Sequence, residues 1–141
     1  MNNKLITKAN EIIMDGTKDW RRGICTLALL DKDGFPTVST LSLAKADGIK
    51  WLTFATGLDS NKAQRIKNSD KASVCFNSEH YNITLVGTIS ILTDPQTKKD
   101  TWYDGCEHHF SGVDDPNYCV LKFTPHRYCI FIGEDEAEGT L

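Results

Sequence analysis

Apolar residues recur along the chain with two periods, one typical of a helix and one typical of strands. Near the N-terminus, Leu5, Ala9, Ile12 and Ile13 share one face of an amphipathic helix, which we expect over residues 4–14. From residue 23 onward, short apolar runs alternate with turn residues, as they do in a sheet of short strands. We expect seven strands, over residues 23–30, 36–43, 49–56, 72–76, 83–91, 118–123 and 128–132.

Turn and cap residues between the apolar runs complete the expected order of elements. Asp31-Lys32-Asp33-Gly34 is typical of a tight hairpin turn. A second helix is expected over residues 60–68, and a third from Asp94-Pro95, an N-cap followed by proline, to about Tyr103. Because turns join the first four strands, the order favours an antiparallel sheet, which loses its edges by closing into a barrel. The expected fold is mainly β, one domain over residues 1–141 with about seven strands and about three peripheral α-helices.

Three places break the regular pattern. Val38 and Leu41 are three residues apart in an expected strand, so a bulge near Ser39-Thr40 would restore the alternation. Pro125 marks a corner between the last two expected strands. Residues 133–141 are acidic and polar, and we expect them to form an exposed arm.

Composition and charge narrow the classes of function. The 141 residues are 40% hydrophobic, and their net charge of −3 provides no basic field for nucleic acid or an anionic membrane surface. No apolar run approaches the roughly 18 residues of a membrane span, and residues 1–16 lack the long apolar core of a signal peptide. The five cysteines are odd in number and form no CxxC motif, so we expect reduced thiols and a cytoplasmic location.

One candidate site lies between the third expected strand and the second expected helix. Thr56 ends the strand, Ser60 is the candidate N-cap, and Lys62 lies in the first helical turn. Hydroxyls, a cation and the free N–H groups of a helix N-terminus together make an anion site. The same residues also fit an ordinary capped surface helix with a solvated lysine, so the spacing alone leaves both interpretations open.

A second cluster, Cys106-Glu107-His108-His109, contains residue types that bind metal ions. Adjacent side chains in a loop rarely converge on one ion, and no second cluster is spaced to complete a tetrahedron. We therefore expect no metal site, and expect this loop to cover either a subunit interface or a cofactor pocket. The neighbouring Trp102 and Tyr103 fit core packing, with stacking on a cofactor as the alternative.

Several short motifs occur in the order that one known family shows. They are D-x-D-G-x-P at 31–36, F-x-T-x-x-x-S-x-K at 54–62, a strand with Val74 and Phe76 after Asn68, and Gly87 before Asp94-Pro95. Each motif is degenerate, but their order and spacing together are fairly specific. Over residues 20–132 the chain resembles the pyridoxamine 5′-phosphate oxidase-like split-barrel superfamily, and within it the branch of general stress proteins.

The resemblance implies an FMN-binding split β-barrel that forms a homodimer with flavin at the subunit interface. It implies that Thr56, Ser60 and Lys62 hold the FMN phosphate, and that backbone groups of the irregular strand at 39–42 contact the isoalloxazine ring. Asn82 stands in the place of a glutamine that reaches the cofactor in true oxidases. The residues assigned to the cofactor in this way are Ser39, Thr40, Leu41, Ser42, Phe54, Ala55, Thr56, Ser60, Asn61, Lys62 and Asn82.

The chain also departs from the oxidases of this superfamily. Ser39 and Asn61 stand where those enzymes have, or often have, arginine. Fewer cations imply weaker phosphate binding, because each charge-assisted hydrogen bond contributes roughly 1.5–3 kcal/mol. The C-terminal substrate-binding segment of the oxidases has no evident counterpart, so we do not expect oxidation of pyridoxamine 5′-phosphate.

The expected function is that of a cytoplasmic, FMN-binding oxidoreductase whose small-molecule substrate and electron donor the sequence does not define. No side chain identifies itself as a catalytic acid, base or nucleophile. The alternatives are a non-catalytic flavin or nucleotide carrier or sensor, a haem-binding barrel with His80 or His109 as axial ligand, and a structural barrel without a cofactor. FAD or a deazaflavin would be an alternative to FMN in the same site.

Overall fold

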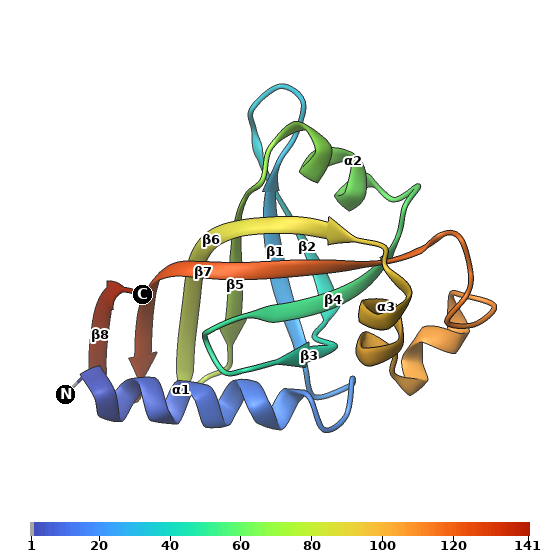
Figure 1. Cartoon of the computed structure of the whole chain (residues 1–141). Coiled ribbons are helices and arrows are strands. Elements are labelled where there is room, and N and C mark those ends of the chain that lie inside the picture. Colours follow the sequence, from blue (N-terminus) through green and yellow to red (C-terminus); the bar gives the residue numbers. More distant parts are fainter. Residues whose placement is uncertain (1) are drawn as a thin grey trace.

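The structure is a computed structural model, and it describes residues 2–141. Strands dominate it, and three α-helices and one short 3-10 helix surround them (Figure 1). The elements in chain order are α1 (Asn2–Gly16), β1 (Ile24–Leu30), β2 (Pro36–Ser42), β3 (Lys45–Ala46), β4 (Leu52–Gly57), α2 (Asn61–Asn68), β5 (Lys71–Asn77), β6 (Tyr81–Leu92), α3 (Pro95–Thr101), η1 (Asp104–His108), β7 (Tyr118–Ile132) and β8 (Asp135–Thr140).

The strands form one antiparallel sheet that curls into a split barrel. Its order is β2-β1-β5-β6-β7-β4-β3, and β8 pairs with the free side of β7. The two ends of this order are joined by the chain itself, because β2 passes through Leu43-Ala44 directly into β3. The Leu43 N–H donates to the Gly23 carbonyl at 2.9 Å and the Ala44 N–H to the Thr53 carbonyl at 2.8 Å. The expected mainly β, antiparallel split barrel is confirmed.

The inner face of the sheet makes the core. Cross-strand partners such as Leu27 and Val74, or Leu85 and Tyr128, place apolar side chains on this face. Helix α1 closes one end of the barrel (Figure 1), and its Leu5, Ala9 and Ile13 are at most 1% exposed. The apolar stripe predicted for this helix therefore packs as expected, while α2 lies at the opposite end of the barrel (Figure 1).

The expected bulge in β2 is wrong. Strand β2 pairs with β1 in an unbroken register from Ile24↔Ser42 to Leu30↔Pro36. Val38 and Leu41 lie on opposite faces, since Val38 pairs with Ala28 on the outer face and is 68% exposed, whereas Leu41 packs against the core. The spacing of three residues therefore reflects two separate faces rather than a break in the strand.

A bulge occurs instead between β6 and β7, where the register shifts between Val86 and Gly87. A Cβ on Gly87 would collide with the carbonyl oxygen of Thr124, so only glycine allows this close approach. Pro125 pairs with Gly87 within the continuous strand β7. Strands β6 and β7 bend sharply together at this bulge (Figure 1), so the expected corner is present, but it lies within one continuous strand rather than between two.

The expected exposed arm at 133–141 is also wrong. Residues 135–140 form β8, which pairs with β7 from Ile132↔Asp135 to Arg127↔Thr140. Ala137 is 4% exposed and packs on the core, while the acidic residues on either side point outward. A single small apolar residue between charged ones is too weak a signal for a strand, and pairing with β7 decides the structure.

The remaining boundaries differ by a few residues. The expected third strand begins at Leu52 rather than at residue 49, and α3 ends at Thr101 rather than near Tyr103. The sheet has eight strands rather than seven, because β3 and β8 were missed and two expected strands are the single strand β7. No helix of residues 2–141 is long and apolar enough to cross a membrane.

Candidate functional site

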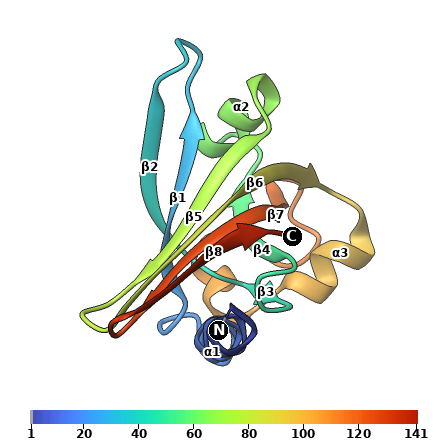
Figure 2. The same ribbon diagram turned by 90° about the vertical axis from the view of Figure 1, so that its left-hand side faces the viewer.

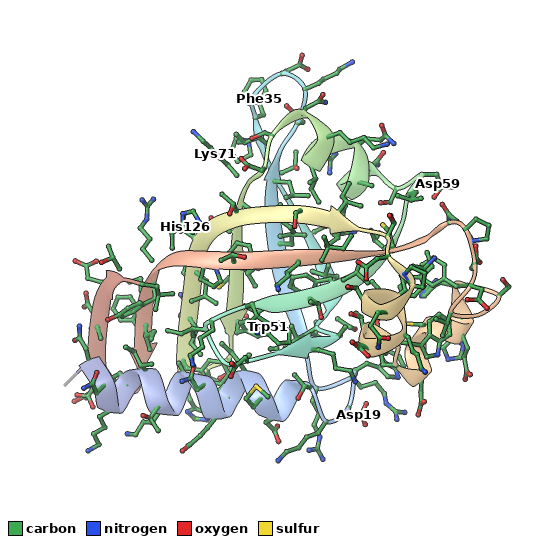
Figure 3. The ribbon with its side chains drawn as sticks, viewed as in Figure 1. Asp19, Phe35, Trp51, Asp59, Lys71 and His126 are labelled. Atoms are coloured by element: carbon green, nitrogen blue, oxygen red, sulfur yellow. The ribbon has the colours of Figure 1, made fainter. Side chains whose placement is uncertain are left out.

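A cavity of about 490 Å³ lies where β2 and β4 meet the start of α2. Its walls come from residues 40–42 of β2, residues 55–57 of β4, and the segment around η1. Asp59 stands at its rim, on the right-hand side of the molecule in Figure 3. We call this the β2–α2 cavity.

Six of the eleven residues predicted to contact a cofactor line this cavity. They are Thr40, Leu41, Ser42, Ala55, Thr56 and Lys62. The other predicted residues lie elsewhere for separate reasons. Phe54 is fully buried in the core, Ser39 pairs with Leu27 on the inner face, and Asn61 is exposed outside the lining.

The start of α2 combines a cap with free backbone donors. The Ser60 hydroxyl oxygen accepts hydrogen bonds from the Ala63 N–H and from the Thr56 hydroxyl, both at 3.1 Å. Ser60 is therefore the helix N-cap, as predicted, and does not itself line the cavity. Within residues 2–141, neither the N–H of Asn61 nor that of Lys62 has a hydrogen-bond partner.

Lys62 is the cation of the cavity. Its side chain is half-buried against the lining, and it makes no ion pair with any residue that the structure describes. An ammonium group beside a helix N-terminus is repelled by the helix dipole, so it is stable there only with solvent or an anion. The Asp59 carboxylate is nearby at the rim but is exposed.

Asn117 holds the loop that leads into α2. Its carbonyl accepts from the Leu58 N–H at 2.7 Å, and its Oδ1 accepts from the Asp59 N–H at 3.2 Å. A Cβ on Gly57 would lie 2.7 Å from Asn117 Nδ2, so a larger residue at 57 would displace the Asn117 side chain from this position. Sequence reasoning missed Asn117, since it is 58 positions from its partner and carries no motif.

Asp115 and Lys98 hold Asn117 in turn. The Asp115 carboxylate accepts from the backbone N–H groups of Ser111 and Asn117, both at 2.9 Å, and these bonds hold the pKa of Asp115 below its usual value. Lys98 is 8% exposed, and its ammonium donates to the Asp115 carbonyl at 3.0 Å and lies 5.2 Å from the Tyr118 ring centroid. The buried Lys98 therefore holds the loop that contains Asp115 and Asn117, and this loop in turn positions the start of α2.

Strand β2 offers backbone groups at its free edge. In an antiparallel pair, hydrogen-bonded and non-hydrogen-bonded residues alternate. Because Leu43 donates to Gly23 and Asp31 donates to Phe35, the odd-numbered residues of β2 point their backbone groups at β1. Thr40 and Ser42 therefore present their N–H and C=O groups to the unpaired edge beside the cavity, whereas Ser39 and Leu41 do not.

The segment around η1 forms the opposite wall. Cys106 is 1% exposed, and burial raises the pKa of its thiol. Burial likewise raises the pKa of Tyr103 to about 12, while His108 and His109 are exposed at the rim. Among residues 2–141, no three cysteine, histidine or carboxylate side chains gather closely enough to hold a metal ion. The segment covers the β2–α2 cavity.

Asn82 lies away from the cavity, on the outer face of the sheet. It pairs with Asn77 on one side and Phe131 on the other. Its Oδ1 accepts from the Cys75 thiol at 3.4 Å and its Nδ2 donates to the Thr84 hydroxyl at 3.1 Å. Asn82 therefore does not join the other predicted residues within one chain.

Comparison with known proteins places the chain in a family. The family model of pyridoxamine 5′-phosphate oxidase matches residues 17–129. The chain belongs to the pyridoxamine 5′-phosphate oxidase family. None of the curated proteins compared matches the chain.

Solved structures of this family share the fold. A Clostridium acetobutylicum protein described as related to general stress protein 26 is 26% identical, with a TM-score of 0.84 over 100% of this chain and 97% of that one. General stress protein 26 of Bacillus anthracis is 22% identical, with a TM-score of 0.77 over 94% and 98%. A haem-binding protein of Mycobacterium smegmatis is 15% identical, with a TM-score of 0.73 over 96% of this chain and 57% of that one. These likenesses show that the chain shares the fold of these proteins.

Proposed function

We propose that the protein binds FMN in the β2–α2 cavity, with the phosphate at the start of α2. The observation that carries this proposal is the position of Lys62 at the wall of a cavity, beside two backbone N–H groups that have no hydrogen-bond partner within residues 2–141. A dianion there would satisfy the free donors and reverse the unfavourable interaction between Lys62 and the helix dipole. The Thr56 hydroxyl lines the same wall.

The rest of the cavity suits the other parts of FMN. Its volume of about 490 Å³ is within the usual range for a small-ligand site. The free backbone groups of Thr40 and Ser42 match the hydrogen-bonding edge of an isoalloxazine ring, and a bound flavin would supply the redox chemistry. We infer that the residues of this chain bind and orient the flavin, and that the protein is an oxidoreductase of the cytoplasm, where its five unpaired cysteines remain reduced.

We also propose that two copies associate through the outer face of the sheet. Figure 2 shows this face, made by β2, β1, β5, β6, β7 and β8 in that order, with no helix in front of it. The exposed apolar side chains Ile24, Val38 and Phe131 all point from it. A cavity of about 550 Å³, lined partly by Leu30 and Val86, opens on the same face. Lys71 and His126 mark this cavity in Figure 3, on the side opposite Asp59.

A homodimer of this kind gives Asn82 a role. Asn82 shares the outer face with Thr40 and Ser42, and on that face it cannot reach the cavity wall of its own chain. In the proposed dimer it would extend toward the flavin of the second copy. Each flavin site would then be completed by both subunits.

Haem is the second candidate, and one observation favours it. His109 lines the β2–α2 cavity and is an available axial ligand, whereas His80 lies in the turn between β5 and β6. The many polar side chains of the cavity, such as Thr56, Lys62 and Asn117, suit a nucleotide better than a porphyrin. FMN is therefore the cofactor that we propose.

Titration with cofactors tests the proposal. We expect purified protein to bind FMN at micromolar concentration or tighter, seen as quenching of flavin fluorescence and a shift of its visible absorption, with riboflavin binding more weakly because it lacks the phosphate. Haem added under the same conditions is the comparison, with a Soret band as its readout. Failure of FMN to bind at micromolar concentration, or preference for haem, would contradict the proposal.

Replacing Asn117 by alanine tests the loop that positions α2. We expect FMN affinity to fall about threefold to tenfold, because the Asp59 N–H loses its side-chain acceptor and the start of α2 loosens. Asn68→Ala, at the exposed far end of α2, is the matched control and should leave the affinity unchanged. Equal affinities for the two variants, at equal thermal stability, would show that Asn117 does not position the phosphate site.

A further inference from the structure

A second cleft adjoins the β2–α2 cavity. It has a volume of about 370 Å³, and we call it the tryptophan cleft after its two indole rings. The residues that define it are Lys18, Trp20, Arg21, Lys45, Trp102 and Tyr103. Trp20 and Tyr103 also line the β2–α2 cavity, so one wall separates the two spaces.

Both indole rings are held in place before any ligand arrives. A Cβ on Gly105 would lie 3.1 Å from the Trp20 ring, and the His108 ring packs at its edge with centroids 6.5 Å apart. Trp102 packs edge-on against Tyr118, with ring centroids 5.3 Å apart. Each indole is nevertheless only half-buried and lines the cleft. Fixed, partly open aromatic rings are suited to stacking a flat base.

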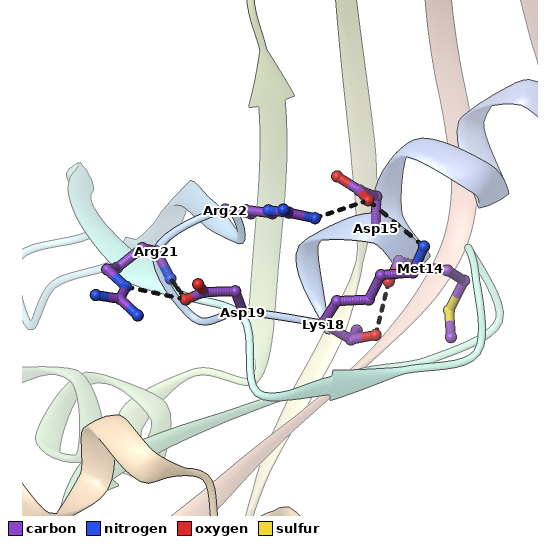
Figure 4. Close-up of polar contacts among 7 residues, drawn as sticks. Met14, Asp15, Lys18, Asp19, Arg21 and Arg22 are labelled. Carbon is purple, nitrogen blue, oxygen red and sulfur yellow. Dashed lines mark hydrogen bonds and ion pairs between the residues drawn. The ribbon is translucent and has the colours of Figure 1, made fainter.

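A cluster of ion pairs arranges the charges at the mouth of the cleft (Figure 4). Asp15 pairs with Lys18 at 3.7 Å and with Arg22 at 3.5 Å. Asp19 accepts from the backbone N–H of Arg21 at 3.0 Å and from its Nε at 3.1 Å, and these bonds lower the pKa of Asp19. The guanidinium of Arg21 is thus oriented through Nε.

The cleft contains cationic groups that can bind an anion. The terminal nitrogens of Arg21 make no hydrogen bond within residues 2–141, and Lys45 makes no ion pair there. Lys45 is half-buried on β3 and lines the cleft. Against Lys18, Arg21 and Lys45 stand only Asp19 and Asp104 among the lining residues. The lining therefore carries one more positive than negative charge.

We propose that the tryptophan cleft binds a purine nucleoside diphosphate, with its base on Trp102 and its phosphates at Lys45 and at Arg21, whose guanidinium lies over the Trp20 ring. A partly open aromatic ring beside cationic groups is the combination that such a ligand needs. Its source is either a free nucleotide or the adenine half of a nicotinamide dinucleotide. The second source would place the nicotinamide toward the β2–α2 cavity, and this part rests on the proposed function.

Titration of the full chain with ADP, and separately with NADH, tests the proposal without flavin. Calorimetry gives the affinity, and quenching of tryptophan fluorescence by ADP reports the place. We expect Lys45→Gln to weaken ADP binding about tenfold, and Lys50→Gln, an exposed lysine outside the cleft, to change it less than twofold. Trp51→Phe should keep the quenching, since Trp51 lies outside the cleft beside Lys122, whereas Trp102→Phe should lose much of it.

The outcomes separate this site from the flavin site. Binding of ADP that responds to Lys45 but not to Lys62 supports the proposal, and tighter binding of NADH than of ADP would identify the dinucleotide as the source. Absence of binding of both probes at millimolar concentration overturns it. An equal loss of ADP affinity in Lys45→Gln and Lys50→Gln also overturns it. Weaker ADP binding by Lys62→Ala overturns it as well, because that result would place ADP in the β2–α2 cavity. FMN binding is measured independently, so its failure leaves this test intact.

Discussion

Lys62→Ala is expected to weaken FMN binding by about tenfold to a hundredfold, because it removes one charge-assisted contact with the phosphate. The contact is strong for a structural reason. The ammonium is half-buried at the wall of the β2–α2 cavity, and no carboxylate pairs with it in the described part of the chain. The wild-type helix start lacks a second cation, since Asn61 stands next to Lys62.

Riboflavin makes this test specific. It carries the same ring as FMN without the phosphate, so Lys62→Ala should leave riboflavin affinity unchanged and reduce the preference for FMN. Lys67→Ala, in the last turn of the same helix and exposed, is the matched control and should bind both flavins as the wild type does. If Lys62→Ala weakened the two flavins equally, or neither, the phosphate would lie elsewhere and the proposed orientation would be wrong.

The elements that the sequence predicts well are those whose local pattern agrees with their tertiary contacts. Helix α1 is one, because Leu5, Ala9 and Ile13 repeat at helical spacing and all meet the core. Strand β8 is the opposite case. Its single buried residue, Ala137, leaves no readable alternation, and the strand exists because β7 offers an unpaired edge. The same holds for β3, which has only two residues and depends on β4.

The residues of the candidate site differ in the same way in how well the sequence predicts them. The residues at 56, 60 and 62 could be predicted together because they lie within seven positions and share one helix start. Asn117 could not, since it reaches the cavity from a distant part of the chain and no short motif contains it. Residues 40–42 of the strand predicted to contact the cofactor line the cavity, and a regular strand exposes only alternate backbone groups there.

Val38→Glu is expected to convert the proposed dimer into a monomer and to weaken FMN binding at the same time. Val38 is 68% exposed at the centre of β2 and lies in one cross-strand row with Ala28, Ser73 and Val86. A glutamate buried there by a second copy would lie beside Ala28, four strands away from Arg127 at the far end of the row, so the dimer dissociation constant should rise by about a hundredfold or more. Light scattering or analytical ultracentrifugation over a range of protein concentrations measures it.

The FMN affinity of the Val38→Glu variant decides whether the second copy contributes to the flavin site or whether one chain binds FMN alone. Asn82 lies on the outer face and outside the cavity of its own chain, so a monomer would lack the amide that the second copy supplies. Met14→Glu, on α1 away from this face, should leave both the dimer and the FMN affinity unchanged. A folded Val38→Glu variant that remains dimeric would show that another surface forms the interface. A monomeric variant that binds FMN as tightly as the wild type would show that the β2–α2 cavity is sufficient within one chain, and that Asn82 has no part in flavin binding.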